Sequence, residues 1–280
     1  MKTLFLLLVL APCAARSQMR DSLQVRDEAP SSFRRTVSVG MVAGSLALSV
    51  VWAFDEWWKG KSYPFHFLKE GWFDDYSLGI DKLGHAYTSY FYFNMFHTIL
   101  LWGGHDEEDA FWWATGASAA FAIGVEVGDG ITDYGFSYED LTANMLGLGF
   151  GILRVKVPFM RNFSFKWSYI PEPGYNAALR FTRHYDGHTY WLAFNVHDLL
   201  PEGLQSWWPS FLQLAAGYSV ADGQTRREGV IGLDFNLEIF QPPNRDIALV
   251  QKVVNMIHLP APGIKFPEGR PAEFKLLYTN

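Results

Sequence analysis

Long stretches without charge constrain this chain more than any other feature. Thr36 to Phe54 and Ala86 to Trp102 contain no Asp, Glu, Lys or Arg, and each approaches the length that crosses a bilayer as a helix. Helical patterns also cover Ala110 to Val127 and Tyr138 to Val157, with Ser137 as the expected N-cap of the last helix. The sequence therefore predicts an α+β chain in which residues 36–157 form an apolar, membrane-embedded four-helix bundle.

Small residues repeat four positions apart within three of these predicted helices, and such spacing lets helices pack closely in lipid. They are Gly40 and Gly44; Gly116, Ala120 and Gly124; and Gly147 and Gly151. One observation argues against a membrane-embedded bundle. The uncharged core of the last helix, Leu141 to Leu153, is shorter than a bilayer requires. A soluble bundle with a very apolar core is the alternative.

The N-terminus predicts export. Residues 1–17 resemble a secretory signal peptide, with Lys2, an apolar run and the small residues Ala15 and Ser17 before the cleavage point. Residues 18–35 form a polar leader. The one cysteine, Cys13, follows Pro12 rather than a small residue, so we do not expect lipidation there. The alternative is that residues 3–15 remain as an uncleaved anchor.

Residues 158–280 predict β structure. Asp186-Gly187 and Asp222-Gly223 lie between strand-type segments and indicate hairpin turns. Apolar residues alternate from Ile231 to Ile239, as in a half-buried strand. Residues 245–258 predict an amphipathic helix, and residues 273–278 an edge strand. We expect a small antiparallel β region with one amphipathic helix; a part of an outer-membrane barrel is the alternative, although so few strands could not close one.

Polar residues are expected to meet at one end of the bundle. Successive helices of an up-down bundle alternate in direction, so the start of the second helix, the end of the third and the start of the fourth lie together. Each of these ends has a polar pair at a spacing that puts both members on one helix face. The pairs are Asp81 and His85, Glu126 and Asp129, and Asp140 and Asn144.

This cluster predicts either a metal site or an acid–base site. Many carboxylates cannot all ionise together without a cation, and oxygen ligands with one imidazole suit a divalent metal ion. The candidate metal ligands are Asp81, His85, Glu126, Asp129 and Asp140. The candidate catalytic residues are Asp81, His85 and Glu126, as ligands of an ion that activates water or as base and acid without it.

A purely structural role is the competing interpretation. Asp81 and Asp140 lie in first helical turns, where carboxylates favour the helix dipole. Lys82 and Asn144 would then be structural polar residues, pairing with a carboxylate and with a neighbouring backbone, and the cluster would lock the bundle. His184 and His188 bracket a predicted turn, where we expect exposed side chains without a special role.

The same residues carry a family resemblance. Asp81-Lys82-x-x-His85, Glu126-x-x-Asp129-Gly130 and Ser137-x-x-Asp140-x-x-x-Asn144-x-x-Gly147 resemble the YfiM-like family of uncharacterised bacterial envelope proteins. The order of these motifs is more distantly similar to VanZ-like membrane proteins, although Gly128-Asp129-Gly130 departs from their pattern. The resemblance implies a bacterial envelope protein and brings no established activity.

Two functions stay open. One is a non-enzymatic envelope protein, associated with the inner or outer membrane, whose partners are membrane lipid and an envelope protein. The other is a membrane-embedded, metal-dependent hydrolase or transferase that acts on lipid or cell-wall precursor headgroups. The net charge of -6 argues against a nucleic-acid partner, which would require a basic surface.

Overall fold

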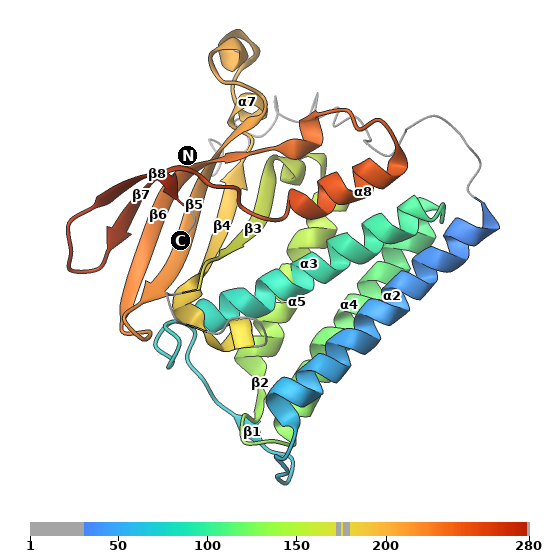
Figure 1. The fold of residues 1–280 in the computed structure, drawn as a ribbon, viewed down its shortest axis with the longest axis vertical. Helices are drawn as coiled ribbons and strands as arrows, with labels where there is room; N and C mark the ends of the chain where they lie inside the picture. The colour runs from blue at the N-terminus through green and yellow to red at the C-terminus, as the bar shows by residue number, and fades with distance from the viewer. Residues whose placement is uncertain (1–30, 172–174, 176–179, 279–280) are drawn as a thin grey trace, which may run out of the picture.

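A layer of helices packs against one antiparallel sheet in the computed structural model, which describes residues 31–171, 175 and 180–278 (Figure 1). The predicted signal peptide and most of the polar leader lie outside the described residues. The α-helices are α2 (Ser32–Ala53), α3 (Ile80–Trp102), α4 (Glu107–Gly130), α5 (Tyr138–Lys156), α7 (Val196–Leu199) and α8 (Arg245–Val254). The strands are β1 (Phe67–Leu68), β2 (Phe136–Ser137), β3 (Phe163–Tyr169), β4 (His188–Phe194), β5 (Leu212–Ala221), β6 (Arg226–Phe235), β7 (Ala261–Pro267) and β8 (Glu273–Tyr278).

Side-chain caps start α5 at the predicted position and α4 three residues before its predicted start at Ala110. The Ser137 hydroxyl accepts a hydrogen bond from the Asp140 backbone N–H and caps α5, as predicted. Asp106 caps α4 in the same way, and acidic residues fill the first turn of that helix, where they favour the helix dipole. A single π-helical turn, Phe54–Trp58, ends α2 and leads into the loop before α3.

The sheet is larger than predicted. Six strands follow one another in the order β3-β4-β5-β6-β7-β8, and every neighbouring pair is antiparallel. The hairpin expected at Asp222-Gly223 joins β5 to β6, and residues 273–278 form the edge strand β8, both as predicted. The outer edge of β3 is extended by a single parallel bridge between Trp167 and Ile257.

Helix α3 is the centre of the molecule, because it has the sheet on one side and helices on the other (Figure 1). Tyr87 and Tyr90 pack against Phe165 and Tyr190 of the sheet. The next turns of α3 pack through Phe93 and Phe96 against α4 and α5. The helices and the sheet therefore share their apolar cores across α3.

The expected membrane-embedded four-helix bundle with a small β region is wrong. Of the described helices, only Ser32–Trp58 and Glu107–Gly130 are long and apolar enough to cross a membrane, and core helices of soluble proteins pass the same test. The apolar residues of α3 are instead explained by burial on two sides, against a six-stranded sheet and against other helices.

Most of the predicted close helix contacts are also wrong. A Cβ atom added at Gly40, Gly44, Gly116 or Gly124 would meet open space. Gly147 is the exception of functional interest, since its Cβ would lie 1.8 Å from the Ala86 carbonyl oxygen. That approach brings the middle of α5 against the first turns of α3, one turn of α5 beyond the polar residue Asn144.

The turn at Asp186-Gly187 is not a hairpin. Tyr185–Gly187 is a short 3-10 turn before β4, and His184 and His188 are buried rather than exposed. His188 opens β4, where its Nδ1 accepts a hydrogen bond of 2.8 Å from the Trp167 indole and its ring stacks on Tyr190. Packing between β3 and β4 therefore removes this histidine from water.

Candidate functional site

The polar residues meet where α3 begins, α4 ends and α5 begins. The loop before α3 is shaped by Asp75, whose carboxylate accepts hydrogen bonds from the backbone N–H groups of Ser77 and Gly79. Gly79 has a φ of 84°, a left-handed conformation that glycine adopts without strain. This turn directs the first residues of α3, including Asp81, Lys82 and His85, toward the ends of α4 and α5.

The Lys82 side chain supplies positive charge at the centre of the site. Its side chain is only 4% exposed, and its Nζ lies 2.7 Å from Asp140, 3.4 Å from Asp81 and 3.5 Å from Asp75. Glu70, from the loop before α3, makes a fourth ion pair with the same ammonium group. One buried lysine thus joins the loop, α3 and α5.

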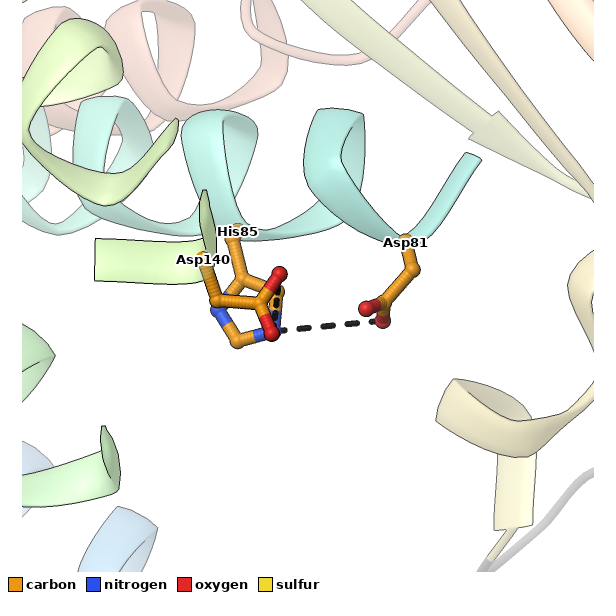
Figure 2. Close-up of side chains that lie close together, drawn as sticks. All are labelled: Asp81, His85 and Asp140. Atoms are coloured by element: carbon orange, nitrogen blue, oxygen red, sulfur yellow. Dashed lines mark ion pairs between the residues drawn. The ribbon is translucent and has the colours of Figure 1, made fainter. Parts of the chain in front are cut away.

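His85 faces two of the same carboxylates, those of Asp81 and Asp140 (Figure 2). Its Nε2 lies 3.8 Å from Asp81 Oδ1 and 3.9 Å from Asp140 Oδ1, too far for direct hydrogen bonds. One ligand atom from each of these three residues falls within 4.8 Å of the others. Oδ1 of Asp140 is buried and accepts no hydrogen bond of regular geometry within the described part of the chain, although Lys82 is near.

The opposite nitrogen of the ring, Nδ1, faces Glu126 and Asn144. Glu126 Oε1 lies 3.4 Å from Nδ1 and accepts a hydrogen bond of 3.0 Å from the Asn144 amide. The Asn144 oxygen in turn accepts a hydrogen bond from the Ser89 hydroxyl. Helices α3, α4 and α5 therefore fix the orientation of the imidazole together.

Asp129 is directed away from this group. Its Oδ1 accepts a hydrogen bond of 2.7 Å from the Trp58 indole, which lies beyond the end of α2. Of the five predicted metal ligands, Asp81, His85 and Asp140 form one group with ligand spacing, Glu126 lies behind the ring of His85, and Asp129 links α4 to Trp58.

Four further residues complete the site, and the sequence did not lead us to expect them there. Glu70 and Asp75 come from the loop between β1 and α3. Their acidic side chains, so close in sequence to Asp81, could have indicated that they belong to the site. Tyr185 comes from the β half and donates a hydrogen bond of 2.9 Å to Asp81. The Tyr76 hydroxyl lies 3.1 Å from that of Tyr185. No local spacing predicts Tyr185, which lies 104 positions from Asp81.

The site is short of positive charge. Burial raises the pKa of Glu126 to about 8 despite the opposing effect of His85, and burial raises the pKa of Asp129 to about 6. Burial also raises the pKa of Glu70 to about 6 against the effect of Lys82. Each of these carboxyl groups is therefore easier to protonate than it would be in water.

The same excess of negative charge raises the pKa of His85 and so favours its protonated form. Burial alone would lower its pKa, but the carboxylates of Asp140, Asp81 and Glu126 raise it to about 9. For Asp81 burial would raise the pKa, yet His85 and Lys82 bring it below its usual value. A proton on His85 thus supplies charge that a metal ion could supply instead.

One comparison with known proteins gives a match, and that match points to the cell envelope. Residues 69–156 match the family model described as "Predicted periplasmic lipoprotein (DUF2279)". The match covers less than half of the chain and includes all the predicted site residues. It supports an uncharacterised family of bacterial envelope proteins and a location in the envelope, but not the YfiM-like or VanZ-like assignment. No curated protein and no solved structure matches the chain.

The matched description includes lipid attachment, whereas the sequence predicts a cleaved signal peptide without it. Cys13 lies outside both the matched segment and the described residues. The prediction on lipidation therefore stays a prediction.

Proposed function

We propose that this envelope protein binds one divalent metal ion between Asp81, His85 and Asp140. The observation that carries the proposal is the position of His85 Nε2, which faces two carboxylate oxygens at 3.8 and 3.9 Å without bonding to either. Ligands of one ion lie about 2.0–2.6 Å from it, so a small inward movement of these side chains would complete the set. Oδ1 of Asp140 also lies 2.7 Å from the Lys82 ammonium group, so an ion here would share this oxygen with Lys82.

The surroundings of His85 support a metal ligand. Histidines that bind metals through one nitrogen usually donate their other N–H to a carboxylate, which fixes the tautomer and strengthens the ligand. Glu126 is placed for that role at 3.4 Å from Nδ1, and the Asn144 amide contacts both Glu126 and Nδ1, at 3.0 and 3.2 Å. The site thus offers the ion three protein ligands and one supporting carboxylate.

Three protein ligands leave coordination positions for water and a substrate, as in catalytic rather than structural metal sites. A divalent ion in such a site lowers the pKa of bound water and polarises a phosphoryl or carbonyl oxygen. The chemistry that fits best is hydrolysis or transfer at an ester or phosphoester of an envelope lipid or cell-wall precursor. Glu126, whose pKa is raised to about 8, would then orient His85.

A structural lock is the second candidate, and the ion pairs of Lys82 favour it. This ammonium group already compensates four carboxylates, so the cluster could hold the helix ends together without any metal. The two proposals differ in one measurable quantity. The metal proposal requires one tightly held divalent ion per chain whose loss follows the removal of His85, whereas the lock requires none.

A further inference from the structure

Exposed aromatic rings surround the end of the molecule at which the site lies. We call Tyr63, Phe65, Phe67 and Tyr138 the aromatic rim. All four are exposed, Phe67 at 57% and Tyr138 at 60%. They belong to the loop that contains β1 and to the first residue of α5, at the lower end of the view in Figure 1. Large apolar side chains that gather on an exposed surface mark an interaction site.

The rim is fixed to the same turn that supports the site. Strand β1 pairs with β2 in parallel, and the backbone N–H groups of Tyr63 and His66 donate to the carbonyl groups of Ile131 and Gly130. The ring of Phe65 occupies the space that a side chain at position 130 would fill, because a Cβ there would lie 2.4 Å from it. The rim therefore sits directly beside the α4–α5 turn, between Asp129 and Asp140 in the chain.

The arrangement of the rings indicates what they contact. Phe67 stacks on Tyr138 with an interplanar angle of 3° and meets Phe65 and Phe136 edge-on. The stacked contact covers one face of each of these two rings, and both rings stay more than half exposed. Two of the four rim residues are tyrosines, whose apolar rings carry a polar hydroxyl group. Amphipathic aromatic side chains of this kind concentrate at the interface between lipid and water.

We propose that the aromatic rim inserts into the headgroup region of a phospholipid bilayer and places the Asp81–His85–Asp140 site against the lipid headgroups. The net charge of -6 disfavours an acidic surface, so a bilayer of zwitterionic lipid is the partner that fits. The contact itself does not depend on a metal ion, whereas delivery of a headgroup to the site rests on the proposed function.

The test is co-sedimentation of the full chain with phosphatidylcholine vesicles. The double variant Phe67→Ser/Tyr138→Ser removes two half-exposed rings, and we expect it to bind the vesicles at least about tenfold more weakly. The matched control is Trp207→Ser, which removes a ring that is 83% exposed in the segment following α7. Helix α7 lies at the opposite end of the molecule from β1 (Figure 1). We expect this control to bind like the unchanged chain.

Three results would overturn the inference. First, the double variant and the control could bind vesicles equally. Second, the double variant could keep its binding to vesicles and lose binding to a soluble chitooligosaccharide. Third, it could keep its binding to vesicles and lose only self-association, measured in the absence of lipid. Thermal unfolding and divalent-ion affinity of the double variant should both be unchanged. A chain that binds vesicles through the rim but binds no metal would refute the proposed function and leave the lipid contact standing.

Discussion

Replacement of Lys82 by methionine tests how the buried charges stabilise the fold. Methionine keeps the apolar length of the side chain but removes an ammonium group that is 4% exposed and lies within ion-pair distance of four carboxylates. Removing one partner of a buried ion pair leaves uncompensated charge and costs about 3–5 kcal/mol. Partial protonation of Glu70, whose pKa is already raised to about 6, would moderate the loss. We therefore expect the free energy of unfolding to fall by about 3 kcal/mol at pH 7.

The assay is urea unfolding followed by circular dichroism, with Lys59→Met as the control. Lys59 also forms an ion pair, with Asp55, but its side chain is 66% exposed, and exposed pairs contribute little to stability. Glu70, Asp75 and Asp81 also have the spacing of a cation site. Millimolar Mg²⁺ or Mn²⁺ should consequently restore part of the stability of Lys82→Met. Equal losses in the two variants would refute the account of Lys82.

Two further predictions concern packing. Burial lowers the pKa of His188 from 6.5 to about 4, with His184 adding to the effect; the unfolded chain then binds the proton more tightly, so the contribution of His188 to stability should fall by about 3 kcal/mol as pH drops from 6.5 to 4. His188→Gln should remove most of this pH dependence in urea titrations, and an unchanged slope would contradict it. Gly147→Ala should cost more than about 2 kcal/mol because its Cβ meets a backbone carbonyl, whereas Gly149→Ala, at a helical position facing open space, should gain up to about 1 kcal/mol. Similar thermal shifts in both glycine variants would show that α3 and α5 do not approach closely there.

Local sequence signals predicted the helices well. The uncharged stretches lie within α2 and α3, and the cap at Ser137 and the hairpin at Asp222-Gly223 occur where the sequence places them. These features depend on residues close in the chain. The same apolar pattern describes a helix in lipid and a helix buried by protein, and so the sequence could not show that a six-stranded sheet covers α3.

The candidate site likewise contains residues that local sequence signals predicted and residues that they could not predict. Helix direction and spacing were enough to bring Asp81, His85, Glu126 and Asp140 together, because those rules are local to each helix and its neighbour. Tyr185 could not be found in this way, since its contact with Asp81 depends on how the β half packs on α3. Asp129 shows the converse: its spacing suits the site, but the Trp58 indole directs its carboxylate elsewhere.

Titration of the metal-free full chain with Mn²⁺ or Zn²⁺ in a calorimeter tests the central claim most directly. The account predicts one tightly bound ion per chain, with His85→Gln and Asp140→Asn each weakening binding by at least about 100-fold, since even supporting residues of metal sites contribute 10–100-fold. Asp133→Asn, which removes a carboxylate paired with Lys61, should leave the affinity unchanged. Absence of binding, or equal affinity in all three variants, would contradict the metal site and leave the structural lock as the better explanation.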